Sequence, residues 1–244
     1  MKKIVAMAVV AAVTVSMVCA QIGVTAGVKG TFGMNLGSTL TDDGKEGVTM
    51  GYDIDLTNKV VVGGGGAIYG RYNMPFHAPL GVQLELGIFA NNGVAVDVDD
   101  SFDESGVKVN VTGSASCSYL SMDIPLLITY DIPVGPVVIT PFVGPNFSIP
   151  LGKLKSKLEY TAKPEGFDEE KIDESTEYDI DPRFIPGIVA GVEVGLPLGP
   201  GSLVADLRYV NDFTNVTIAP EGFDAVEMFT RRSFDISVGY ALKF

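Results

Sequence analysis

The sequence predicts an all-β protein: an eight-stranded antiparallel up-and-down transmembrane β-barrel. Three observations support this fold class. Eight segments alternate apolar and polar residues, the connections between them alternate long and short, and charges of both signs nearly balance on the polar faces. Each segment has about 10 residues or more, which is enough for a tilted strand to cross a bilayer. An even strand number is also typical of single-chain bacterial barrels.

The first twenty residues have the pattern of a secretory signal peptide. A basic start at Lys2 and Lys3 precedes an almost wholly apolar run over residues 4–18, and a cleavage site follows at Ala20. A second interpretation makes Cys19 a lipidated N-terminal residue, but Val18 stands where such a signal has a small residue. We therefore expect residues 1–20 to be removed, with residues 21–244 forming a single barrel domain.

Composition narrows the possible partners. The formal net charge is −13, and the 29 glycines and 14 prolines are spread along the chain without a linker or low-complexity tract. A surface this acidic repels nucleic acid, so we expect no nucleic-acid partner. Cys117 is the only cysteine after residue 20, so no internal disulfide can form there, and we expect it to be a small buried residue.

The clearest strand is the last one, at 233–244, where six apolar residues alternate with small or polar ones and the chain ends at Phe244. The same period of two predicts seven further strands, at 22–36, 60–72, 80–91, 118–132, 137–150, 184–197 and 201–213. The long connections are 37–59, 92–114, 151–182 and 214–231, and the short ones are 73–79, 132–136 and 198–200. Long extracellular loops and short periplasmic turns would place both termini in the periplasm.

The polar faces of the predicted strands carry four cations and five anions: Lys29, Arg71, Glu85, Asp123, Glu193, Asp206, Arg208, Asp235 and Lys243. Charges in bulk water need no such balance, whereas an unpaired charge in a narrow lumen is costly. We therefore interpret these residues as an internal network of ion pairs and hydrogen bonds. The alternative is the solvated face of a soluble sheet.

No motif for catalysis, cofactor binding or metal binding is complete in the sequence. His77, the only histidine, lies in a short turn without a nucleophile beside it in the sequence. Residues 97–103 hint at a calcium loop, but Phe102 and Lys108 stand where the loop needs Gly and Glu. An unspecific calcium site among the loop carboxylates stays open. The glycines at 63–66 lack the Lys-Ser/Thr of a phosphate loop. We expect a protein that is not an enzyme, without cofactor or metal.

The long connections hold the remaining candidates. The peptide Pro-Glu-Gly-Phe-Asp occurs at 164–168 and again at 220–224. It is either a shared turn or a way of presenting Phe167 and Phe223 to a ligand. In the second long connection, Val94, Val96 and Val98 continue the outward face of their strand. We expect a hairpin there, with a bulge near Gly113.

Several stretches resemble the outer-membrane "porin family" of small barrels, which is related in architecture to OmpA-like, OmpW-like and opacity-protein barrels. These stretches are Gly81-Val82-Gln83-Leu84-Glu85-Leu86, Asp123-Ile124-Pro125-Leu126-Leu127-Ile128-Thr129-Tyr130, Pro141-Phe142-Val143-Gly144-Pro145 and Asp206-Leu207-Arg208-Tyr209. The aromatic terminus Phe244 resembles the assembly signal of such barrels. The resemblance implies insertion into the bilayer of the cell outer membrane by the outer-membrane assembly machinery, but it implies no single function.

An eight-stranded barrel has a lumen that side chains can fill. We therefore predict a non-enzymatic outer-membrane protein with a largely plugged lumen and a structural or surface-interaction role. Its long acidic outer loops would act as an adhesin or surface antigen toward an extracellular ligand. One alternative is a narrow porin-like channel or a conduit for small solutes or hydrophobic molecules. Another is a soluble ligand-binding barrel of lipocalin type, with its apolar face inward.

Overall fold

The computed structural model describes residues 23–36, 38–49, 55–74, 79–104, 107–164, 169–181, 183–218 and 225–244. Eight long antiparallel strands form a closed ring in the order β10, β11, β14, β1, β4, β5, β6 and β8, and the β8–β10 pair closes it. This confirms the predicted fold class. The strands are β1 (Val24–Asn35), β4 (Val61–Asn73), β5 (Leu80–Glu104), β6 (Val107–Tyr130), β8 (Val137–Pro164), β10 (Ile185–Leu198), β11 (Gly201–Asp212) and β14 (Arg232–Lys243).

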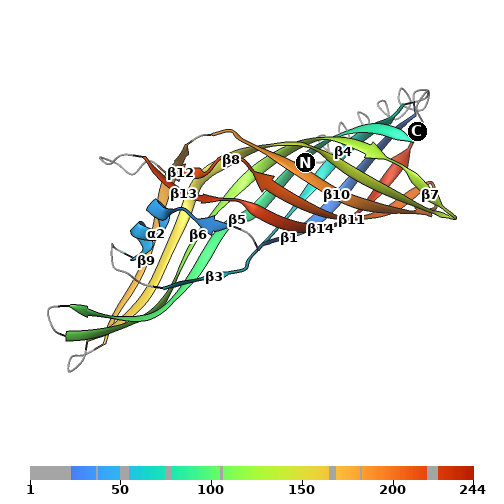
Figure 1. Cartoon of the computed structure of the whole chain (residues 1–244). Coiled ribbons are helices and arrows are strands. Elements are labelled where there is room, and N and C mark those ends of the chain that lie inside the picture. Colours follow the sequence, from blue (N-terminus) through green and yellow to red (C-terminus); the bar gives the residue numbers. More distant parts are fainter. Residues whose placement is uncertain are drawn as a thin grey trace, which may run out of the picture.

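The two ends of the barrel differ. At one end, here called the turn end, short connections join the strands, and Gly135 and Gly199 adopt positive φ angles of 60° and 61° in two of the turns. The first and last strands, β1 and β14, pair there through Thr25 and Lys243. The short strand β7 (Ile132–Val134) lies at this end, far from the long hairpins at the other (Figure 1). The predicted signal segment 1–20, His77, Phe167 and Phe223 lie outside the described residues.

The barrel wall is apolar outside and polar inside. On β5, for example, Leu84, Leu86 and Ile88 are exposed, whereas the alternating Gln83 and Glu85 are buried. The same exposed apolar positions recur around the ring, among them Val28, Phe32, Ile68, Leu126, Ile128, Val143, Val192, Val194, Leu203, Leu207, Ile236 and Val238. This polarity suits lipid outside and a polar lumen inside. It contradicts the lipocalin-type alternative, in which the apolar face would point inward.

Three of the ring strands continue far beyond the apolar belt and form what is here called the outer extension. Strands β5, β6 and β8 carry on as paired ribbons, and β9 (Glu170–Asp181) runs beside β8 (Figure 1). The connection 92–114 forms the expected hairpin, and 151–182, expected as a loop, is also largely strand. The other elements of the extension are β2 (Thr39–Leu40), β3 (Leu56–Lys59), β12 (Val216–Ile218), β13 (Val226–Thr230) and helix α2 (Asp42–Thr49).

A bulge separates the belt from the outer extension on β5. Ala90 and Asn91 together oppose Leu120 of β6, and Asn91 has a φ of 59°. One extra residue exchanges the two faces of a strand. Beyond the bulge the inward face is therefore the even-numbered one. The bulge expected near Gly113 is wrong in position: it lies at residues 90–91.

The same bulge overturns the expected direction of three valines. Val94, Val96 and Val98 do not continue the outward face of β5; they point inward and are only 1–3% exposed. They belong to an apolar core inside the extension, together with Leu40, Val48, Val109, Val111, Ala115, Cys117, Tyr119, Leu154, Tyr160, Ile180, Ile185, Val216, Ile218, Met228 and Phe229. The interior therefore changes from polar within the belt to apolar above it.

The helical content is small. Helix α2 packs on β13, where the Thr41 amide donates a hydrogen bond to the Met228 carbonyl oxygen at 2.9 Å. Within the described ranges, none of the helices combines the length and the apolar character needed to cross a membrane.

Candidate functional site

Four buried charges meet in the middle of the lumen. Lys29 of β1 contacts Glu85 and Asp206, with Nζ–oxygen distances of 2.8 and 3.0 Å. Arg208 of β11 contacts the same two carboxylates, each at 2.8 Å. The four side chains are 1–4% exposed. We call this group of two cations and two anions the central cluster.

Aromatic rings complete the packing around the central cluster. The Lys29 ammonium lies 4.8 Å from the centre of the Tyr69 ring, and the Arg208 guanidinium lies 5.3 Å from that of Phe142. Both distances suit cation–π attraction. Phe142 also belongs to a small apolar group within the lumen, with Leu127, Val189 and Val210. Charge, ring faces and apolar side chains together fill this level of the lumen.

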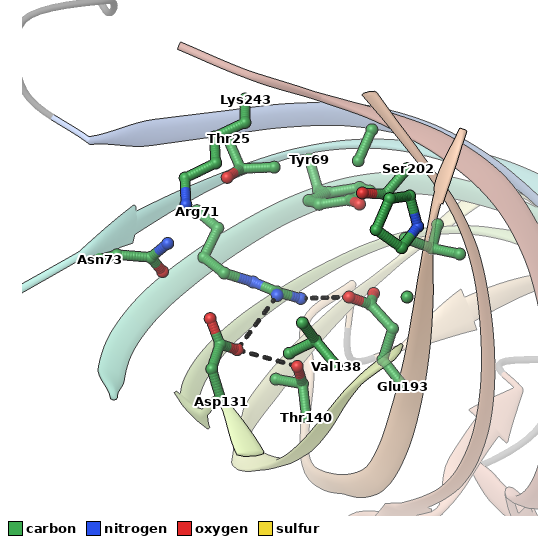
Figure 2. A pocket seen from close by; sticks show the side chains of 14 residues that line it. Thr25, Tyr69, Arg71, Asn73, Asp131, Val138, Thr140, Glu193, Ser202 and Lys243 are labelled. Atoms are coloured by element: carbon green, nitrogen blue, oxygen red, sulfur yellow. Dashed lines mark hydrogen bonds and ion pairs between the residues drawn. The ribbon is translucent and has the colours of Figure 1, made fainter. Parts of the chain in front are cut away.

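A second group lies toward the turn end. Arg71 of β4 contacts Glu193 of β10 at 2.6 Å and Asp131 at 3.6 Å. Its Nε donates to Gln83, and the Gln83 amide donates to Glu85, which joins this group to the central cluster. Figure 2 shows the Arg71 guanidinium between the two carboxylates.

A third group lies toward the outer extension. Arg231 contacts Asp123 at 3.0 Å and Asp212 at 2.9 Å. Ser121 donates a hydrogen bond to Asp123 at 2.9 Å. Arg231 is 2% exposed, so a full positive charge sits in the interior between its two carboxylate partners.

The structure brings most of the predicted lumen charges together. Seven of the nine take part in the ion pairs described above: Lys29, Arg71, Glu85, Asp123, Glu193, Asp206 and Arg208. Asp235 is buried but has no ion pair among the described residues, and Lys243 is exposed at the turn end. Sequence reasoning missed Asp131, Asp212 and Arg231. Arg231 falls in the predicted connection 214–231, and Asp131 and Asp212 sit at the ends of predicted strands, where parity is hard to assign.

A cavity of about 270 Å³ opens at the turn end. Figure 2 shows side chains from several strands pointing into it. Polar groups on its wall come from Thr25, Tyr69, Arg71, Asn73, Asp131, Thr140, Glu193, Ser202 and Lys243. Apolar wall is supplied by Val138, Pro197, Val204 and Ala241. The described residues include no group of three or more His, Cys, Asp or Glu that could hold a metal ion.

Three titratable groups in the outer extension have shifted pKa values. Burial raises the pKa of the Cys117 thiol, which lies 3.7 Å from the Ser156 hydroxyl. Burial also raises the pKa of Tyr160 to about 12, and its hydroxyl donates to the Val48 carbonyl. Hydrogen bonds from the backbone amides of Asp55 and Ser101 lower the pKa of the exposed Asp100 carboxyl. Cys117 and Tyr160 belong to the apolar core of the extension, where they pack against its other members.

These features define a class of protein. A closed ring of eight strands satisfies its backbone internally, carries an apolar belt outside and encloses paired charges. A barrel of this kind crosses a bilayer. The chain is therefore an integral β-barrel protein of the outer-membrane type.

The known proteins that are similar to this chain resemble it in fold. No family model matches the chain, and no curated protein matches its sequence. Among solved structures, the outer membrane protein OprG from Pseudomonas aeruginosa is 13% identical over 91% of this chain and 96% of its own, with a TM-score of 0.48. A major outer membrane protein from Thermus thermophilus is 15% identical over 90% and 99%, with a TM-score of 0.40. Neisserial surface protein A is 13% identical over 91% and 97%, with a TM-score of 0.36.

Proposed function

We propose that this protein is a non-enzymatic outer-membrane barrel, closed to solutes at its centre, that holds a binding surface above the membrane. The central cluster carries the proposal. Lys29 and Arg208 each contact both Glu85 and Asp206, and together these side chains occupy the lumen with almost no exposure. Moving any one of them aside would leave opposite charges unpaired in a low-dielectric interior, which is costly.

The outer extension supports the second half of the proposal. Strand β9 exposes six acids, namely Glu170, Asp173, Glu174, Glu177, Asp179 and Asp181. The β8–β9 pairing and the apolar core beneath hold this face in a fixed shape. Lys153 and Lys155 of β8 stand opposite Asp179 and Glu177, but β9 itself keeps a net negative charge. A face with net acidic charge favours a basic partner at the cell surface, because complementary charge speeds association and selects partners.

Single-channel recording in a planar lipid bilayer tests the closed lumen. The native protein should insert without steady conductance. A variant that removes one cation and one anion, Lys29→Ala with Asp206→Ala, leaves the Arg208–Glu85 pair in place and should open a conducting path. Steady conductance of the native protein would refute the plug. It would favour the narrow channel, with Glu85 and Arg208 as its selectivity residues.

A labelled lysine-rich peptide tests the acidic face. It should bind the native protein in detergent micelles, weakening as salt rises. Binding should fall in the variant Asp173→Asn, Glu177→Gln and Asp179→Asn. As a matched control, Asp42→Asn and Asp43→Asn on α2 should change binding little. Equal loss in both variants would mean attraction to overall charge rather than to β9.

A further inference from the structure

The cavity at the turn end holds buried acceptors without protein partners. Among the described residues, Glu193 Oε2, Asn73 Oδ1 and the Tyr69 hydroxyl lack hydrogen bonds. Glu193 is 3% and Tyr69 5% exposed, and both side chains line the cavity (Figure 2). A carboxylate oxygen left unpaired in such a site costs free energy, so a hydrogen-bond donor is favoured there.

Two of the donor groups already present are committed elsewhere. Arg71 directs Nε to Gln83, Nη2 to Glu193 Oε1 and Nη1 toward Asp131. The Thr140 hydroxyl donates to Asp131 at 2.8 Å. Neither group reaches Glu193 Oε2, so a molecule that brings an N–H donor into the cavity gains a charge-assisted hydrogen bond there. Lys243 is exposed at the rim, where its ammonium can remain in water.

We propose that this cavity binds a small alkyl primary ammonium ion. An ammonium group has three N–H donors and no acceptor, so it can donate to both Glu193 Oε2 and the Tyr69 hydroxyl oxygen, which lie on the same side of the cavity (Figure 2). Val138, Val204 and Ala241 provide an apolar wall for a short alkyl chain. Arg71 and Lys243 balance Glu193 and Asp131 in formal charge. An anion would be repelled by Glu193 Oε2 and could accept only from the Tyr69 O–H among these unpaired groups.

The direction of entry follows from the central cluster. It fills the lumen between this cavity and the outer extension. The ligand would therefore enter and leave through the turn end, which the loop-length pattern assigns to the periplasm. Binding at this site requires no passage through the barrel, so it is independent of the closed lumen and of the acidic face.

Fluorine NMR of protein labelled with 3-fluorotyrosine provides a local test. The protein would be studied as the full folded chain in detergent micelles, and the Tyr69 resonance assigned by its loss in Tyr69→Phe. Propylammonium should shift this resonance to saturation at pH 7. Propanol and propionate, of the same size but without the ammonium donors, should leave it nearly unmoved.

Variants distinguish propylammonium binding at this cavity from general effects of the probe on the protein. Glu193→Gln should weaken propylammonium binding about tenfold or more, because a charged hydrogen bond is lost. Glu193→Asp keeps the charge but withdraws the carboxylate by one methylene and should weaken it by a smaller factor, which covers the case in which Glu193→Gln does not fold. Asp42→Asn on α2 should bind as the native protein does. Equal shifts from all three probes, no saturation by roughly 0.1 M probe, or unchanged binding in both cavity variants would overturn the proposal.

Discussion

Arg208 and Glu85 join opposite walls of the barrel. They are 123 residues apart in the sequence, and their Nη1 and Oε2 atoms lie 2.8 Å apart. Arg208 lies on β11 and Glu85 on β5, which are separated by three strands, β14, β1 and β4, on one side of the ring. The pair therefore links opposite strands of the ring across its diameter, and it also fills part of the lumen.

Removing the Arg208 cation from this ion pair should destabilise the fold strongly. Arg208→Met keeps most of the side-chain volume but leaves Glu85 and Asp206 with Lys29 alone, so we expect a loss of about 3–5 kcal/mol. Urea unfolding, followed by heat-modifiable gel mobility, measures it. Arg232→Met on the exposed face of β14 is the matched control and should cost less than about 0.5 kcal/mol. A loss for Arg208→Met as small as the control's would mean that water reaches the cluster and screens it.

The positions of the eight ring strands could be predicted from the sequence, because period-two alternation fixes a strand and its apolar face. The nearly balanced charges on the other face assign that face to the lumen. The predicted strand 22–36 is observed as Val24–Asn35, and 201–213 as Gly201–Asp212. The charges at lumen parity could be predicted too. Their partners could not, because the parity of Lys29 carries no information about which opposite strand supplies Glu85 or Asp206.

The outer extension was harder to predict for a local reason. On β9 both faces are polar and mostly exposed, so its residues show no alternation and resemble a loop. On β5 the alternation is clear, but the bulge at Ala90 and Asn91 exchanges its faces. A sequence pattern read across such a bulge assigns the valines beyond it to the wrong side.

That bulge should therefore be testable by deletion. Removing Asn91 takes out the extra residue, so the strand alternates regularly while Val94, Val96 and Val98 still face inward. We expect the belt and the core of the extension both to fold, which native-like protection of 92–118 in limited proteolysis with mass mapping would show. Asn91→Gly keeps the bulge and relieves the positive φ, so its digestion should match the native pattern too. Rapid digestion of 92–118 after the deletion would mean that the extension needs the bulge itself and not only inward-facing valines.

Cys117 should be inert in the folded protein. Burial raises its pKa above the ordinary thiol value of about 8.5, so the folded thiol stays protonated where an unfolded one ionises. The unfolded state then binds fewer protons, and this contribution to stability falls as pH rises above about 8.5. Maleimide should label the Cys117 peptide only after unfolding. Cys117→Ala should lack this part of the pH dependence of urea unfolding. Rapid labelling of the folded protein would contradict the burial.

Two glycines on the same strand should respond in opposite ways to an added methyl group. Gly27 lies under the Tyr69 ring, where a Cβ atom would come 2.5 Å from Cε1, whereas Gly30 has nothing within 4 Å. Gly27→Ala must displace the ring and disturb its contact with Lys29, so we expect a loss of about 1–3 kcal/mol. Gly30→Ala should change stability by less than about 0.5 kcal/mol, or raise it, because alanine restricts the unfolded chain. Urea unfolding compares them, and combining Gly27→Ala with Tyr69→Ala separates the clash from other effects. If the ring is the cause, Gly27→Ala should cost little once Tyr69 is already alanine; an unchanged cost would place the strain in the backbone of β1.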